Sequence, residues 1–279
     1  MKEKIKLVFP LVIALIACYP VVFLLTGSFM NKRELEAGLE PVMQGTQGYL
    51  SWKLIPMYPT LRSYVEILLD SPQFFVMFWN SVRLTLGILT GQLLVGVPAA
   101  WGFARFHFPG KKMLFFIYVG LMMMPFQVTM LSNYLVLDRM KLMDTHLSIL
   151  LPAVFSTFPV FIMYRFFASI PEAIIESAKL DGAGKLQIFV RLGIPLGSGG
   201  IVSAMVLGYL EYWNLVEQPL TFLKNKTLWP LSLFLPGIGL EQAGMAFASS
   251  VIALIPALFV FLCGQDYLEQ GITAAAVKE

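Results

Sequence analysis

Long apolar runs, each close to the length needed to cross a bilayer, constrain this chain more than any other feature. Two of them read LVFPLVIALIACYPVVFLLTGSF near the N-terminus and SVIALIPALFVFLCG near the C-terminus. About 20 such residues cross the hydrocarbon core as a helix, because a helix bonds its backbone groups internally. At 57% hydrophobic and 13% charged residues, the chain has too few polar side chains to cover a soluble surface. The sequence therefore predicts an all-α polytopic membrane protein.

Six spans are expected, at residues 7–29, 75–101, 113–135, 147–168, 196–216 and 248–268. Ten Lys and Arg residues fall on the side that holds both termini, mostly close to the spans, whereas the eight on the other side are spread over longer segments. The positive-inside rule then places both termini in the cytoplasm. We expect a single transmembrane domain over residues 1–279, with an outer segment 30–74, a cytoplasmic loop 169–195 and a cytoplasmic tail 269–279.

The cytoplasmic loop before the fifth span is unusually polar for this chain. Ser169 stands three residues before Glu172, which is the spacing of a capping box and predicts a helix start with Pro171 in its first turn. The helix should be amphipathic, since apolar residues recur on one side at helical spacing: Ile174, Ile175 and Ala178. Gly182 should end it, because glycine tolerates a left-handed backbone. A second helix is then expected before Pro195, which gives a helix-turn-helix between spans 4 and 5.

This loop resembles the "EAA" pattern of the membrane subunits of binding-protein-dependent ABC importers. The matching residues are Glu176-Ser177-Ala178, Asp181-Gly182-Ala183, Phe189 and Ile194-Pro195, with Ser177 in a position where the pattern has alanine. Other stretches look like the carbohydrate, MalG-like branch of that family: PTLRSYVEIL (59–68), FWNSV (78–82), AAWGFARFHFPGKK (99–112), MMPFQVTMLSNYLVL (123–137), YWN (212–214) and the closing GITAAAVKE. The closing segment departs from the usual ending of the branch at Ala275 and Glu279.

The resemblance implies a non-catalytic permease subunit in a bacterial cytoplasmic membrane. Its partners would be a second, MalF-like permease, two ATPase subunits that bind ATP and Mg, and an external sugar-binding protein, with no nucleic acid and no cofactor in this chain. The first helix of the loop would be the coupling helix that docks on the ATPase. The residues implied in coupling are Glu172, Glu176, Ser177, Ala178, Asp181, Gly182, Ala183, Phe189, Ile194 and Pro195. A polyol, glycerol phosphate or another small solute is an alternative cargo.

Polar and aromatic residues within the spans form a second candidate site. They are Gln127, Ser132, Asn133, Trp213 and Asn214. A sugar path requires amide hydrogen bonds and an aromatic face, but contacts between helices explain the same residues, so both interpretations stay open. Arg83 and Glu211 also fall within spans and are each expected to reach an interface or a partner subunit.

Other chemistries find little support in the sequence. DGAGK (181–185) is not a phosphate-binding loop, because Lys179 occupies the position of its first glycine and Leu186 that of its hydroxyl residue. No metal site is predicted, since His107 and His146 lack ligand-like companions. Two further classes remain as alternatives: an ion-coupled carrier, which would have acidic residues within its spans, and a membrane hydrolase, which would need a convergent catalytic set. Pro125 is expected to kink the third span.

Overall fold

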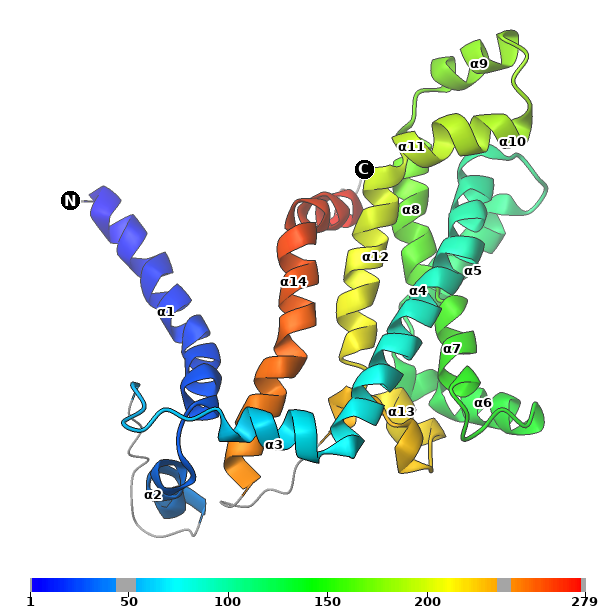
Figure 1. Cartoon of the computed structure of the whole chain (residues 1–279). Helices are drawn as coiled ribbons and strands as arrows, with labels where there is room; N and C mark the ends of the chain where they lie inside the picture. The colour runs from blue at the N-terminus through cyan, green and yellow to red at the C-terminus, as the bar shows by residue number, and fades with distance from the viewer. Residues whose placement is uncertain (1, 44–53, 235–241, 277–279) are drawn as a thin grey trace. The chain divides into compact units, whose positions relative to one another are not determined.

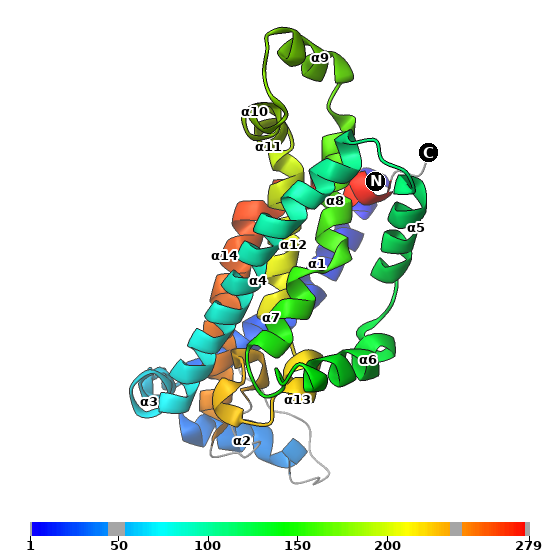
Figure 2. The same ribbon diagram turned by 90° about the vertical axis from the view of Figure 1, so that its right-hand side faces the viewer.

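The structure, a computed structural model, describes residues 2–43, 54–234 and 242–276, and all the regular elements in these residues are helical (Figures 1 and 2). The longer helices are α1 (Lys2–Ser28), α2 (Lys32–Met43), α3 (Arg62–Asp70), α4 (Pro72–Arg105), α5 (Lys111–Met122), α6 (Phe126–Arg139), α7 (Leu147–Val154), α8 (Thr157–Ser169), α9 (Glu172–Leu180), α12 (Ser198–Trp213) and α14 (Ala243–Ala276). The shorter ones are α10 (Lys185–Ile188), η1 (Phe189–Gly193), α11 (Ile194–Leu196), α13 (Glu217–Phe222), η2 (Lys226–Leu228) and η3 (Leu231–Leu233).

The chain divides into two compact units. Unit 1 contains Met1–Val76 and Leu233–Pro256, and unit 2 contains Met77–Ser232 and Ala257–Glu279. The helices α4 and α14 each contribute to both units. The loop 169–195 and the polar residues of the spans all fall in unit 2.

Within the described residues, four helical segments are long and apolar enough to cross a membrane: Phe9–Ser28, Pro72–Arg105, Leu147–Ser169 and Ala243–Glu269. Two bent pairs bring the total to as many as six, namely α5 with α6 and Lys185–Leu196 with α12. The bend between α5 and α6 is 104°. The kink expected at Pro125 is therefore present, but it is so large that residues 113–135 do not form one straight span. At 1.5 Å per residue, the 12 residues of α5 alone extend about 18 Å.

The fourth predicted span is also interrupted, between α7 and α8. Pro159 lies in the first turn of α8 and has no N–H to donate to the carbonyl of Phe155, so the helix cannot run on from α7. The carbonyl of Ala153 at this break accepts a hydrogen bond from Gln92 Nε2 at 2.8 Å. Gln92 is 1% exposed, and its amide also reaches the Tyr212 hydroxyl at 2.9 Å. The Ala153 carbonyl also accepts from the Ser156 N–H at 3.1 Å, so this buried glutamine of α4 adds a second bond at the break.

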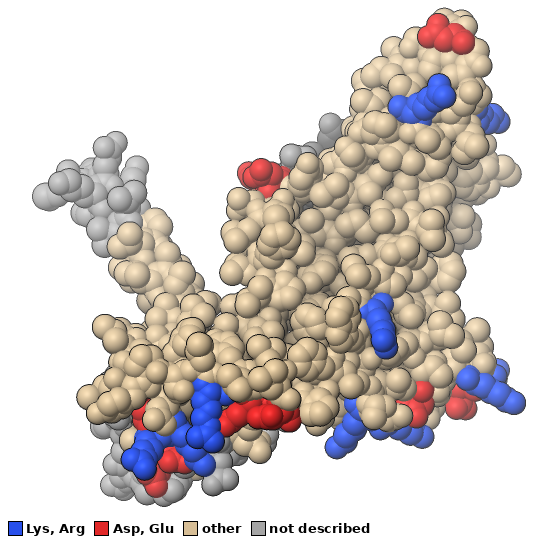
Figure 3. Space-filling view, in the orientation of Figure 1, with Lys and Arg blue, Asp and Glu red and all other residues tan. Residues whose placement is uncertain are grey.

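The core of unit 2 lies where α4, α8 and α12 run side by side (Figures 1 and 2). Trp101 of α4 is at its centre, with ring centroids 5.4 Å from Phe167 and 5.5 Å from Phe189. A Cβ atom at Gly193 would lie 2.7 Å from the Trp101 ring, so the absence of a side chain there permits the close approach. In Figure 3, the visible face of unit 2 is almost free of charged side chains between its two ends, as expected for a lipid-facing surface.

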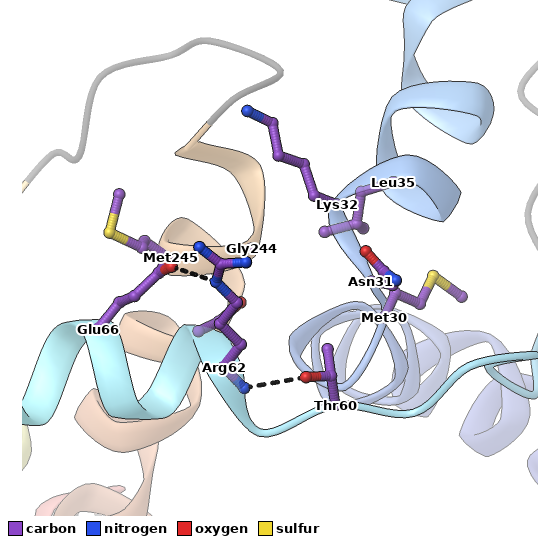
Figure 4. Close-up of a pocket in the computed structure, with 10 residues that line it drawn as sticks. Met30, Asn31, Lys32, Leu35, Thr60, Arg62, Glu66, Gly244 and Met245 are labelled. Atoms are coloured by element: carbon purple, nitrogen blue, oxygen red, sulfur yellow. Dashed lines mark hydrogen bonds and ion pairs between the residues drawn. The ribbon is translucent and has the colours of Figure 1, made fainter.

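Unit 1 includes the segment 30–74, which the sequence predicts to lie outside; residues 44–53 of it are outside the described residues. Its helices are joined by aromatic contacts, such as Phe23 with Phe247 at 5.3 Å, and by a hydrogen bond of 2.8 Å from the Tyr64 hydroxyl to Ser28 Oγ. A pocket of about 360 Å³ lies among α2, α3 and the start of α14 (Figure 4). Both of its cationic side chains are paired, Arg62 with Glu66 at 2.7 Å and Lys32 with Glu36 at 3.8 Å.

Candidate functional site

The polar loop projects from unit 2 beyond the ends of α4, α8 and α12, with α9 as its outermost helix (Figures 1 and 2). Arg105, the last residue of α4, holds the near end of this loop. Its Nη1 lies 2.9 Å from Glu172 Oε2, and its Nη2 donates to the carbonyl of Phe167 at 2.7 Å and to that of Ile170. One guanidinium therefore joins the end of α4 to the last turn of α8 and the first residue of α9.

The predicted capping box at the start of α9 is wrong. Ser169 is still the last residue of α8, and its hydroxyl donates to the Phe166 carbonyl at 2.8 Å. Pro171 occupies the N-cap position and has no side chain that can cap. Glu172, expected to reach back to the cap, bonds Arg105 and also lies 3.8 Å from Lys179 Nζ. The capping box does not form because Ser169 stays in α8 and the Glu172 carboxylate pairs with Arg105 of α4.

The far end of α9 matches the prediction. Gly182 has φ of +79°, so the expected left-handed turn is confirmed. Its N–H bonds the carbonyl of Lys179 at 3.0 Å, and the N–H of Ala183 bonds that of Ala178 at 2.9 Å. These two bonds form a Schellman motif, in which a glycine lets the chain satisfy the last carbonyls of a helix. Asp181, the C-cap residue, has its side chain exposed.

The second arm of the loop returns to the core as the helical run α10, η1 and α11. The N–H of Ile194 bonds the carbonyl of Phe189, five residues earlier, which gives η1 its π-helical turn. Pro195 follows at once and lacks the N–H that an α-helix would use there. The ring of Phe189 packs on Trp101, while Ile194 is partly buried against the same core. The motif residues of this arm therefore fix it to α4.

The opposite surfaces of α9 differ in character. Ile175 and Ala178 are buried against the core, whereas Ile174, expected on the same side, is 36% exposed. Glu176 and Ser177 are exposed, and the most exposed apolar side chains of the loop are Leu180 at 89% and Leu186 at 73%. A loop that is held to the core by Arg105 and exposes two leucines is typical of a surface that meets another protein.

A cavity of about 540 Å³ occupies the other end of unit 2. It is lined by α5, α6, α7, α8, α12 and α13, and its polar side chains include Asn133, Glu211 and Gln218. Among the described residues, none forms a hydrogen bond or an ion pair with these three side chains. The cavity therefore offers amide and carboxylate groups to whatever enters it.

The other predicted path residues are not brought together with Asn133. Trp213 is 4% exposed and packs on Tyr209 and Phe78, with centroids 5.7 and 5.8 Å away. Gln127 donates to Glu217 at 2.6 Å, and Asn214 donates to the carbonyl of Leu210 in its own helix at 2.9 Å. None of these residues, nor the exposed Ser132 and Arg83, lines the cavity.

Sequence reasoning missed three structural residues of α4. The charge pattern indicates only that Arg105 lies on the predicted cytoplasmic side, although a lone arginine at the end of an apolar helix commonly bonds carbonyls and carboxylates nearby. No sequence pattern distinguishes Gln92, a single amide within an apolar run. Asn80 is 3% exposed and donates to the carbonyls of Thr227 and Trp229, at 2.7 and 3.1 Å, and thereby holds the segment after α13.

Known proteins are similar to this chain in sequence and in fold. The arabinooligosaccharides transport system permease protein AraQ of Bacillus subtilis is 26% identical over 97% of this chain and 94% of its own length. The sn-glycerol-3-phosphate transport system permease protein UgpE of Pectobacterium atrosepticum is 26% identical over 73% of this chain and 74% of its own. A chain of a bacterial ABC transporter involved in the import of the acidic polysaccharide alginate has the same fold, with a TM-score of 0.79 at 22% identity and 95% coverage of both chains.

A family-wide sequence pattern matches most of unit 2. It is that of the binding-protein-dependent transport system inner membrane component, and the match covers residues 92–274. The matched segment contains the whole loop 169–195, the last turns of α4 with Arg105, and the cavity. This chain therefore belongs to the family of binding-protein-dependent transport system inner membrane components, the permease subunits of ABC importers.

Proposed function

We propose that this chain is the permease subunit of a carbohydrate importer and that α9 is the helix through which an ATPase subunit acts on it. The observation that carries the proposal is the anchoring of α9 by Arg105, which bonds α4, α8 and α9 at once. A displacement of α9 by the ATPase would move the ends of α4 and α8, because the Arg105 guanidinium bonds both α8 and α9 directly rather than through a flexible linker. Leu180 and Glu176 are exposed and would contact the ATPase.

The assembly we infer has four membrane-associated chains. This chain would pair with a second, MalF-like permease and with two ATPase subunits that carry ATP and Mg, while an external binding protein delivers the solute. It would form a single domain with six spans in a bacterial cytoplasmic membrane, with both termini and the loop 169–195 inside. In that orientation the cavity lies in the outer half of the permease, where a delivered solute would arrive.

The chemistry of the cavity favours a neutral carbohydrate as cargo. Asn133 and Gln218 supply amide donors and acceptors for hydroxyl groups, and Glu211 supplies a carboxylate acceptor. A carboxyl group there accepts hydrogen bonds from hydroxyl groups and supplies no cation to pair with a phosphate or a uronic acid. Among the relatives, a permease named for arabinooligosaccharides therefore suggests this chain's cargo better than one named for glycerol phosphate.

The test is ATP hydrolysis by the purified complex in nanodiscs, with its binding protein and a panel of solutes. We expect neutral oligosaccharides to stimulate hydrolysis and sn-glycerol 3-phosphate to have no effect. Glu211→Gln should lessen the discrimination against anionic solutes while leaving the yield of the complex unchanged. Stimulation by glycerol phosphate alone would contradict the carbohydrate assignment without touching membership of the importer family.

A further inference from the structure

A second hollow lies at the loop end of unit 2, and Arg105 and Glu172, which anchor α9, are among its lining residues. Its volume is about 370 Å³, and it lies between the end of α4 and the two arms of the loop. Trp101, Ile175 and Ile188 contribute its apolar wall. The charged and titratable residues that line it are Arg105, His107, Glu172, Lys179 and Lys185.

Positive charge exceeds negative charge in this pocket. Three permanent cations line it against the single carboxylate of Glu172, which leaves a surplus of two positive charges with His107 neutral. Glu172 lies 2.9 Å from Arg105 and 3.8 Å from Lys179, so it is shared between them. Among the described residues, no carboxylate pairs with Lys185.

One donor of Arg105 is without an acceptor. The Nε atom of Arg105 is buried and has no hydrogen-bond partner among the described residues, although both Nη atoms of the same side chain are bonded. The arginine side chain is only 11% exposed, so bulk water is a poor substitute. Buried donors are usually satisfied, so an acceptor oxygen bound beside Arg105 would complete its hydrogen bonding.

The pocket lies beside the proposed docking surface. Glu172, Ile175 and Lys179 recur at helical spacing on the side of α9 that lines the pocket. Leu180 and Glu176 are exposed on the same helix. Neither of these two side chains lines the pocket.

We propose that this pocket binds a phosphate group, with the Nε–H of Arg105 as a donor and Lys179 and Lys185 as cationic walls. A phosphate suits the site because it combines one to two negative charges with acceptor oxygens on several sides, whereas the donors come from α4, α9 and α10. Bound there, it bridges the end of α4 to both arms of the loop. The phosphate could belong to an anionic lipid headgroup or to a soluble compound, since the pocket lies where a span ends.

The experiment compares lysines that lie on the same side of the membrane. The full complex is prepared as wild type, as Lys185→Ala and as Lys112→Ala, whose side chain is exposed at the start of α5 and does not line the pocket. Each is reconstituted in nanodiscs of phosphatidylcholine alone or mixed with phosphatidylglycerol. Retained lipid is measured by native mass spectrometry. Equilibrium dialysis with labelled inorganic phosphate is carried out on the phosphatidylcholine nanodiscs.

If the ligand is a lipid headgroup, the wild type and Lys112→Ala retain phosphatidylglycerol, and Lys185→Ala loses about tenfold in retention. If the ligand is soluble, inorganic phosphate binds instead, with the same dependence on Lys185. Equal losses in both lysine variants would show only general surface attraction and would overturn the proposal. So would the absence of binding of both phosphatidylglycerol and inorganic phosphate to the wild type.

Discussion

The loop lies at one end of unit 2, whereas α6, α7 and α13, which line the cavity, lie toward the other end (Figure 1). In the loop, Arg105 is paired with Glu172, and leucines are left exposed. In the cavity, Asn133 and Glu211 line the hollow with no hydrogen-bond partner among the described residues, beside apolar residues such as Met124 and Phe155.

This contrast separates two kinds of partner. A rigid element with exposed leucines gains free energy by burying them against another protein. A hollow lined by amides and a carboxylate gains free energy by bonding a hydrated solute that exchanges its water for them. The five changes below test the contrast, from the largest expected effect to the smallest.

Arg105→Ala should have the largest effect, because it removes the bonds that join α4, α8 and α9. We expect a loss of about 3–5 kcal/mol in the docking of the loop on its own core, because the charge-assisted hydrogen bonds to the carbonyls of Phe167 and Ile170 are lost, whereas the pair with Glu172, 58% exposed, adds little. The measurement is co-purification with the ATPase subunit, together with proteolysis at Lys179. Arg105→Lys keeps the charge but cannot make all of the guanidinium bonds, so its association with the ATPase should be intermediate. Unchanged association in Arg105→Ala would mean that the anchor is dispensable.

Trp213→Ala should lower the stability of the folded chain rather than the rate of transport. The side chain is 4% exposed between Tyr209 and Phe78, and large-to-small changes at such sites cost about 3 kcal/mol or more. The yield of the assembled complex should fall, and Trp213→Phe should recover much of it. A normal yield with impaired sugar transport would instead restore Trp213 as a stacking face of the path.

Leu180→Glu should weaken ATPase association by roughly tenfold to a hundredfold, because a buried leucine contributes about 1.5–3 kcal/mol. Leu69→Glu is the matched control, since Leu69 is 77% exposed and lies in the segment 30–74, on the proposed outer side. Association is measured by titrating the purified ATPase onto the permease pair. Equal effects of the two changes would mean that a nonspecific loss of solubility, and not docking, is being observed.

Gly182→Val should strain the turn, because φ is +79° there and a residue with a Cβ atom costs about 1–2 kcal/mol of backbone free energy in that region. Among the described residues other than its two chain neighbours, no atom lies within 4 Å of a Cβ built at Gly182, so backbone strain and not collision is the expected cause. Solute-stimulated ATP hydrolysis should fall about tenfold. Gly182→Asn, which tolerates a left-handed backbone, should remain near the wild type. If the two variants are equally impaired, a bulk effect at the ATPase surface would replace the strain argument.

Asn133→Leu should have the smallest effect, a severalfold fall in transport at normal complex yield. It removes one amide of the cavity, and a single hydrogen bond contributes about 1 kcal/mol. Uptake of labelled solute into proteoliposomes measures it. Asn214→Leu is the control, because that amide bonds the Leu210 carbonyl of its own helix, outside the cavity. A fall confined to Asn214→Leu would move the path away from this cavity.

The parts predicted from sequence were those that depend on neighbouring residues. The turn at Gly182 and the two-armed loop follow from local backbone preferences, and the apolar runs placed α1, α4 and α14. The capping box failed because Arg105, 67 residues away from Glu172, competes for the carboxylate. The cavity could not be predicted, since which side of a helix faces a hollow depends on the rotation of neighbouring helices. The ion-coupled carrier and the hydrolase lose their support through the family match.

The most direct test of the central claim is the protection of a single cysteine at position 180. With Cys18 and Cys263 replaced, Leu180→Cys and Lys112→Cys are each labelled with a water-soluble maleimide, in the permease pair alone and in the complex with the ATPase. If α9 docks through its exposed face, labelling at 180 is fast in the pair and at least about tenfold slower in the complex, while labelling at 112 stays unchanged. Equal labelling at position 180 with and without bound ATPase would contradict the account.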